Sequence, residues 1–234
     1  MSSTSGSDAA EPDTRTPLER LGVLATQQVE ITETLHHLEM FTMEGLLTVM
    51  WHGAHDAEEV VIACGGAMGG LLGPADGLYH DLGVALIEHD IAMLRIGYRR
   101  PNDLSACTLD VAAAAEVSAR QGGQRMVTMG HSFGGAIAVR VGAFLPEVVV
   151  GVVTLATQSA GCEVAEHLAG RPLLMFHGDA DELLPVQASE VVRQLAGGTG
   201  ELVVLPGTGH LLTQSSDALR ERLMTWIPET LATP

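Results

Sequence analysis

The chain has 234 residues, of which 46% are hydrophobic, so it is long and apolar enough to bury the core of one domain. Its 12 basic and 29 acidic residues give a net charge of −17, which repels phosphate backbones and anionic lipid and excludes nucleic acid and membranes as expected partners. All 12 basic residues are arginine, which excludes Schiff-base chemistry on lysine, and three widely spaced cysteines exclude a disulfide framework and favour a cytoplasmic location.

The first segment, residues 1–20, is predicted to be a flexible N-terminal tail, followed by a single domain over residues 21–234. The stretch from Met1 to Pro17 is rich in Ser, Thr, Asp and Pro, and it lacks the basic start and apolar stretch of a secretory signal. No apolar run approaches the ~18–20 residues that a membrane-spanning helix needs. We therefore expect no membrane anchor.

An antiparallel edge of a sheet is predicted next. Residues 28–35 and 46–52 alternate between apolar and polar side chains, which is typical of strands with one buried face. A turn around Glu44 and Gly45 separates the two segments. We expect them to lie side by side at the edge of the main sheet.

From residue 59 onward, short apolar runs alternate with segments of helical composition. The expected strands are residues 59–64, 91–96, 125–130, 148–156, 172–178 and 201–207. The expected helices are residues 78–88, 107–120, 132–143, 163–169, 187–196 and 215–231. The apolar runs are nearly continuous, as in strands that are buried on both faces. This alternation predicts an α/β fold with helices on both faces of a parallel sheet, in which ligands bind at the carboxyl ends of the strands.

A G-x-S-x-G motif follows the expected strand 125–130, where the sequence reads GHSFGG from Gly130. A serine on a sharp strand-to-helix turn exposes its hydroxyl, and side chains at Gly130 and Gly134 would collide in such a turn. The helix N-terminus beside it stabilises developing negative charge. Ser132 is therefore the candidate nucleophile, and the alternative is a serine that only caps the following helix.

Candidate acids and a candidate base follow the next two expected strands. Three carboxylates come after strand 172–178, namely Asp179, Asp181 and Glu182. His210 comes after strand 201–207, downstream of the serine and the acids. We expect His131, beside the serine, to point elsewhere on the turn, and His177 to be a structural residue that ends its strand. A serine needs an imidazole to take its proton and a carboxylate to orient that imidazole. The order Ser, Asp, His makes His210 the predicted base, with Asp179 a rival to Asp181 and Glu182 a weaker candidate.

The motifs GHSFGG, HGDADELLP and GTGH together resemble the α/β-hydrolase superfamily over about residues 28–232. The resemblance implies an eight-stranded, mostly parallel sheet and assigns the nucleophile, acid and base to Ser132, Asp181 and His210. It favours Asp181 over Asp179 as the acid. The small layout is similar to dienelactone-hydrolase-like members, which characteristically use a cysteine where this chain has Ser132. Residues 157–170 are too few for the cap domain common at that point, so we expect an open site.

The chain departs from the superfamily pattern in the loop after residue 64. Many relatives carry His-Gly there, whereas this chain has Cys64 followed by a run of glycines. A glycine-rich loop still suits an oxyanion hole, whose expected donors are the backbone N–H of Phe133 and that of Gly66 or Ala67. The alternative is a flexible glycine turn. We expect Cys64 itself to be an inert residue at a strand end.

Three further side chains are candidates for binding the substrate, namely Met68, Arg99 and Arg100. The two arginines follow strand 91–96, at the edge of the sheet where the site is expected. A guanidinium matches the geometry of a carboxylate, so one of them is a candidate to bind a carboxylate of the substrate or product. The alternative is that both pair with acidic residues such as Asp103.

The leading functional prediction is hydrolysis of a small-molecule carboxylic ester or thioester through an acyl-serine intermediate, with no cofactor. The alternatives are an acyltransferase or amidase with the same triad, and a non-catalytic binding member of the fold. A metal hydrolase would have to use His52, His55 and Asp56, which lack further ligands, so we expect a solvated turn there and no metal. The substrate and the oligomeric state stay open.

Overall fold

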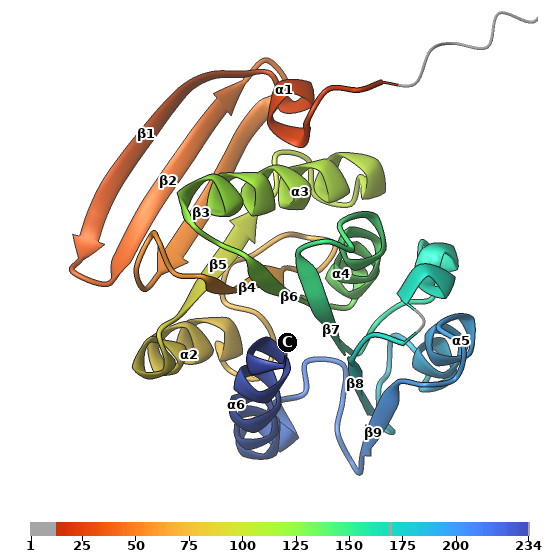
Figure 1. Cartoon of the computed structure of the whole chain (residues 1–234). Coiled ribbons are helices and arrows are strands. Elements are labelled where there is room, and N and C mark those ends of the chain that lie inside the picture. Colours follow the sequence, from red (N-terminus) through yellow and green to blue (C-terminus); the bar gives the residue numbers. More distant parts are fainter. Residues whose placement is uncertain (1–12, 169, 234) are drawn as a thin grey trace, which may run out of the picture.

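A computed structural model describes residues 13–168 and 170–233 of the chain. Its centre is a nine-stranded sheet in the order β1-β2-β3-β5-β4-β6-β7-β8-β9. The six strands from β4 to β9 are parallel, and β1, β2 and β3 extend the sheet in antiparallel pairing beyond β5 (Figure 1). The strands are β1 (Val23–Thr32), β2 (Leu35–Thr42), β3 (Gly45–His52), β4 (Glu59–Cys64), β5 (Ile91–Gly97), β6 (Arg125–His131), β7 (Val149–Leu155), β8 (Leu173–Gly178) and β9 (Glu201–Leu205).

Helices cover both faces of the sheet (Figure 1). The helices α1, α3, α4 and α5 contribute to a hydrophobic cluster on one face, and α2 and α6 to a second cluster on the other. They are α1 (Pro17–Leu21), α2 (Leu78–Ala85), α3 (Leu104–Gln121), α4 (Phe133–Phe144), α5 (Gln187–Leu195) and α6 (Ser216–Ala232), with short 3₁₀ helices η1 (Leu86–His89), η2 (Glu163–Leu168) and η3 (Thr213–Ser215). Within the described ranges, no helix is both long and apolar enough to cross a membrane.

The central strands are buried on both faces, as their apolar runs predicted. In β4, Val60 and Ile62 belong to the cluster under α3 and α4, whereas Val61 and Ala63 belong to the cluster under α2 and α6. Successive side chains of a strand point to opposite faces, so both sets of positions must be apolar when helices cover both faces. The predicted α/β architecture is confirmed.

The antiparallel edge contains three strands, not the two that were predicted, so the sheet has nine strands and not eight. Residues 28–35, expected as one strand, include the end of β1, a two-residue turn at Glu33 and Thr34, and the start of β2. Thr32 pairs with Leu35 to close this hairpin. Glycine, proline and asparagine are the residues that usually indicate a hairpin turn, and this turn contains none of them. The sequence therefore did not indicate that one strand ends and another begins within residues 28–35.

Residues 17–20, predicted to belong to the flexible tail, are helical instead. Residues 1–12 lie outside the described residues, but Pro17–Leu21 form α1. Thr16 caps this helix: its hydroxyl accepts the N–H of Glu19, and the Glu19 carboxylate accepts the N–H of Thr16 at 2.8 Å. The N–H of Leu18 donates to Glu116 of α3, also at 2.8 Å. A capping box with proline at the first helical position is strong enough to begin a helix in a polar segment.

The connection between β7 and β8 leaves the site uncovered. Its regular structure is η2, which replaces the helix predicted for residues 163–169; Ala169 itself lies outside the described residues. No cap domain is inserted among the described residues of this connection, as predicted. The carboxyl ends of the parallel strands are therefore open to ligands from that side.

Candidate active site

Ser132 is the single residue between β6 and α4, and its backbone is strained. It has φ 56° and ψ −117°, a conformation that residues with a side chain seldom adopt. A Cβ atom at Gly130 would lie 1.9 Å from the carbonyl oxygen of Gly134, and one at Gly134 would lie 2.3 Å from that of Cys64. The predicted collisions at both glycines are confirmed. The Ser132 side chain makes no capping hydrogen bond to α4, which argues against the alternative of a simple helix cap.

The carboxylate of Asp181 lies against the ring of His210. Asp181 follows β8, and its Oδ2 atom is 2.8 Å from Nδ1 of His210. Its Oδ1 atom accepts the backbone N–H groups of Leu183 and Leu184, both at 2.8 Å. Burial disfavours the charged form, but the N–H groups of Leu184 and Leu183 and the His210 ring hold the pKa of Asp181 below its ordinary value. Asp181 is therefore a fixed, ionised partner for His210.

The two rival acids make different contacts. Asp179 accepts the backbone N–H of Gly207 at 2.6 Å, which ties the turn after β8 to the turn after β9. Glu182 accepts the backbone N–H of His210 at 3.3 Å and makes no hydrogen bond to its ring. Among the described residues, Asp181 is the carboxylate that hydrogen-bonds the His210 imidazole.

His210 and Ser132 line the same cavity, which has a volume of about 530 Å³. The ring of His210 uses Nδ1 for the bond to Asp181, which leaves Nε2 as the nitrogen available to exchange a proton with a substrate or a hydroxyl. The backbone of His210 is held by His131, whose Nε2 donates to the His210 carbonyl at 3.0 Å. His131 itself lines the cavity, with its ring centre 4.8 Å from that of His210, and does not point elsewhere as expected.

His177 is a second imidazole beside the Asp181 carboxylate, and its approach to Asp181 was not anticipated from the sequence. The ring is buried, with Nδ1 2.7 Å from the hydroxyl of Ser189 and Nε2 3.0 Å from the carbonyl oxygen of Leu184. The same Nε2 is 3.3 Å from Oδ2 of Asp181. The HGDAD motif places His177 four residues before Asp181, a spacing that could have indicated this pair.

The glycine-rich loop after β4 is held by the only two tyrosines of the chain. The Tyr79 hydroxyl donates to the carbonyl of Cys64 at 2.9 Å, and the Tyr98 hydroxyl donates to that of Gly65 at 3.1 Å. Burial raises the pKa of both phenols, so both stay protonated and able to donate. The carbonyl of Gly66 accepts the N–H of Gly69 at 2.9 Å. These bonds favour a fixed loop over the alternative of a flexible glycine turn.

The candidate oxyanion donors lie at the two sides of the nucleophile turn. Phe133 is the first residue of α4, directly after Ser132. Gly66 and Ala67 line the cavity with Ser132, and a Cβ at Gly66 would lie 3.6 Å from Nδ1 of His131. Cys64, just before this loop, is fully buried, and burial raises the pKa of its thiol, in keeping with the inert role expected of it.

The structure does not bring Arg99 and Arg100 to the cavity. The Arg99 side chain is buried and forms ion pairs with Asp110 of α3 and with Glu44 in the turn before β3. Arg100 pairs with Asp103 at 2.9 Å, as the alternative proposed. Because Asp110 is itself fully buried, its charge requires the guanidinium of Arg99 as a partner, and Arg99 is not free to bind a substrate carboxylate. Met68, the third candidate, does line the cavity.

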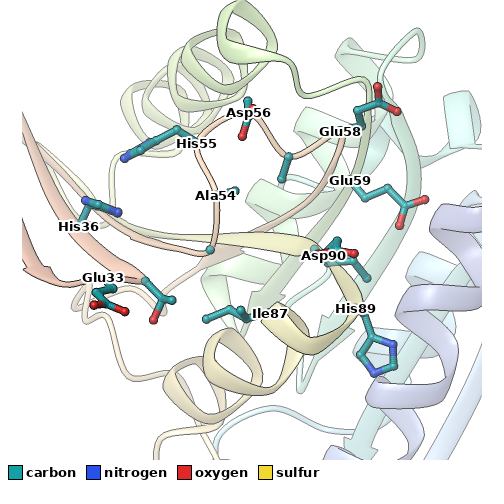
Figure 2. A pocket seen from close by; sticks show the side chains of 14 residues that line it. Glu33, His36, Ala54, His55, Asp56, Glu58, Glu59, Ile87, His89 and Asp90 are labelled. Carbon is teal, nitrogen blue, oxygen red and sulfur yellow. The ribbon is translucent and has the colours of Figure 1, made fainter.

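A second cavity, of about 680 Å³, lies at the opposite end of the sheet, where β4 and β5 begin. Figure 2 shows its lining, which includes His55 and Asp56 of the rejected metal hypothesis. His52, the third member, is buried elsewhere and packs edge-on against His80 at 5.5 Å between ring centres. Within the described part of the chain, no group of three or more His, Cys, Asp or Glu residues is placed to hold a metal ion.

Acid should destabilise the fold through two buried histidines. Burial is the main cause that lowers the pKa of both His52 and His131 to about 4. An unfolded histidine titrates near 6.5, so the unfolded state binds more protons and stability falls as the pH drops from about 6.5 towards 4. At about pH 5 we expect each of the two histidines to lower the free energy of unfolding by about 1–2 kcal/mol relative to its value at neutral pH.

Urea unfolding near neutral pH and at about pH 5 measures this loss. His52→Gln should reduce the acid-induced change in the free energy of unfolding, because this variant removes one of the two groups. His167→Gln, at an exposed position, is the matched control and should leave the change as it is. An acid-induced change that is equal in His52→Gln and the unmodified chain would contradict the assignment.

No protein-family model matches the chain, and no curated protein matches its sequence. Solved structures do match its fold. Est1E from Butyrivibrio proteoclasticus superposes with a TM-score of 0.72 at 15% identity, covering 84% of this chain and 99% of that one. A serine hydrolase homologue from Coxiella burnetii gives 0.67 at 21% identity, covering 84% and 99%. Dienelactone hydrolase from Anabaena variabilis gives 0.66 at 17% identity, covering 86% and 99%. The chain therefore has the α/β-hydrolase fold, which confirms the resemblance seen in the motifs.

Proposed function

We propose that the protein is a serine hydrolase that cleaves carboxylic esters through an acyl-serine intermediate. The observation that carries the proposal is the 2.8 Å hydrogen bond between Asp181 and His210. His210 lines one cavity together with Ser132, whose hydroxyl makes no hydrogen bond to cap α4. Solved structures with the same fold include a serine hydrolase homologue and a dienelactone hydrolase, which supports a hydrolytic reaction. Hydrolysis of simple aryl esters, compared between the chain and its Ser132→Ala variant, tests the proposal.

In the proposed mechanism the Ser132 hydroxyl attacks the ester carbonyl while Nε2 of His210 takes its proton. The carboxylate of Asp181 holds the ring in the tautomer with the proton on Nδ1 and stabilises the imidazolium that forms. The imidazolium then protonates the departing alcohol, which leaves the acyl group on Ser132. A water molecule, deprotonated by His210, attacks the acyl-serine, releases the acid and restores the serine hydroxyl.

The negative charge on the carbonyl oxygen requires fixed donors. We assign these to the N–H of Phe133 and to that of Gly66, with Ala67 as the alternative. In a trans peptide the N–H points opposite to the preceding carbonyl, so the bond from Tyr98 to the carbonyl of Gly65 also sets the direction of the Gly66 N–H. Tyr98 is therefore proposed as a positioning residue for the oxyanion hole.

Replacing Tyr98 by phenylalanine should lower kcat about tenfold and change KM less than about twofold, because the freed peptide would weaken transition-state binding more than substrate binding. Steady-state kinetics with an aryl ester measure both constants. Tyr79→Phe is the matched control, since it also removes one buried hydroxyl but frees the carbonyl of Cys64, one peptide further from the donor. Equal kcat losses in the two variants would rule out a specific role for Tyr98.

Acyl transfer and amide hydrolysis would use the same residues, and a binding protein would use none of them for chemistry. Product analysis separates these alternatives: the acid is the product of hydrolysis, a new ester or amide forms if added alcohols or amines accept the acyl group, and an inactive binding protein turns over no substrate.

We further propose a cytoplasmic location and no membrane or nucleic-acid partner, on the basis of the free cysteines and the net charge of −17.

A further inference from the structure

The cavity that holds Ser132 and His210 is built almost entirely from small and apolar residues. One wall is the chain from Gly65 to Gly73, and the other is formed by Leu183 and Leu211, which follow β8 and β9. Both walls are formed by chain segments that follow the carboxyl ends of strands, where Ser132 also lies. A ligand in the cavity would therefore lie beside the Ser132 hydroxyl. A volume of about 530 Å³ is sufficient for a small-molecule ester.

None of the described residues that line this cavity is Asp, Glu or Arg, and its ionisable side chains are His131 and His210. Asp181 lies behind the ring of His210 and is itself buried. Arg95 is buried and donates to the carbonyl of the wall residue Leu71 at 3.2 Å, whereas Arg99 is paired with Asp110 and Arg100 with Asp103. A substrate carboxylate would therefore meet no arginine among the described residues that line the cavity, and the net charge of −17 would oppose its approach.

The mouth of the cavity carries large apolar side chains that are exposed to solvent. We name these four side chains the apolar rim: Met68 (94% exposed), Leu72 (63%), Leu183 (68%) and Leu211 (59%). Single exposed apolar residues are common on protein surfaces, but a group that surrounds one opening indicates a binding surface. The rim comes from three separate loops, so the fold gathers these side chains around the candidate nucleophile.

We propose that the apolar rim binds the acyl chain of an uncharged ester and makes such esters the preferred substrates. The proposal rests on the proposed function, because the chain must extend from a carbonyl carbon held at Ser132. A chain lying along the open rim is covered on one side, so each methylene gains about half the free energy of full burial. That corresponds to about a twofold increase in kcat/KM per methylene.

The first experiment measures kcat/KM for para-nitrophenyl acetate, butyrate, hexanoate and octanoate, which share one leaving group. We expect a steady rise with chain length, and a loss of about tenfold when the end of the hexanoate chain carries a carboxylate. Met68→Ser and Leu183→Ser should each lower the octanoate-to-acetate ratio about fivefold. The matched controls are Met43→Ser (85% exposed) and Leu24→Ser (65% exposed), which lie away from the cavity and should leave the ratio unchanged.

The second experiment measures binding without turnover, through displacement of the uncharged dye Nile red by methyl octanoate from the Ser132→Ala variant. Added in that background, the two rim substitutions should weaken the binding of methyl octanoate, whereas the two controls should not. Hydrolysis that depends on Ser132 but is independent of chain length, or faster with the carboxylate ester, would overturn the rim proposal alone. If the chain hydrolysed no ester faster than its Ser132→Ala variant does, the proposed function would fail. In that case, equal binding of methyl octanoate by the rim and control variants would overturn the rim proposal as well.

Discussion

Replacing Ser132 by alanine should lower the kcat of ester hydrolysis by a factor on the order of 10⁶, the largest effect expected of any single change in this chain. The reaction loses its nucleophile, and His210 and Asp181 together cannot replace it. The strained turn at Ser132 requires glycine at positions 130 and 134 and does not require the Ser132 hydroxyl, so the alanine variant should fold. Steady-state kinetics with para-nitrophenyl butyrate and labelling with a fluorophosphonate probe measure the loss.

The probe should label the unmodified chain once, at Ser132, and should not label the alanine variant. Ser118→Ala is the control, because it removes the hydroxyl of a buried serine on α3, outside the cavity, and should change neither labelling nor kcat by more than about twofold. Labelling of the Ser132→Ala variant at the original rate would show that another residue is the nucleophile.

Asp181→Asn should lower kcat by about 10⁴, because an asparagine cannot hold His210 in the required tautomer. The Oδ1 atom of asparagine can still accept the N–H groups of Leu183 and Leu184, so the loop after β8 should keep its conformation. Its NH₂ group would then face Nδ1 of His210 and favour the tautomer with the proton on Nε2, which cannot accept the serine proton. Steady-state kinetics at neutral pH measure the effect.

Asp179→Asn and Glu182→Gln should each cost less than about tenfold in kcat. Asp179 contacts the backbone of Gly207, and Glu182 contacts the backbone N–H of His210; an amide oxygen can accept either bond. A larger loss in either of these variants than in Asp181→Asn would make that residue the acid and refute the role proposed for Asp181.

Much of the fold could be predicted from the sequence, because its central elements have local and repetitive signals. The nearly continuous apolar runs of β4 and β6 reflect burial on both faces, and each begins at the predicted residue. The antiparallel edge was harder to predict, since β1 is exposed along most of its length and its turn into β2 carries no glycine or proline. Helix α1 was missed because its evidence is a capping box of a few residues in a polar segment.

The sequence by itself determined the parallel sheet, the turn that holds Ser132 and the position of His210 after β9, the strand next to β8. Each of these features depends on residues that are adjacent in the chain. The motifs favoured Asp181 over Asp179, but the contact with His210 is seen only in the tertiary structure: both acids follow β8, and the turn directs Asp181 to His210 and Asp179 to the backbone of Gly207. The same holds for Arg99, whose partner Asp110 lies on the next helix and removes the arginine from the cavity. Motifs identify residues that act together, but hydrogen bonds and ion pairs form between side chains that the folded backbone brings within about 3 Å of each other.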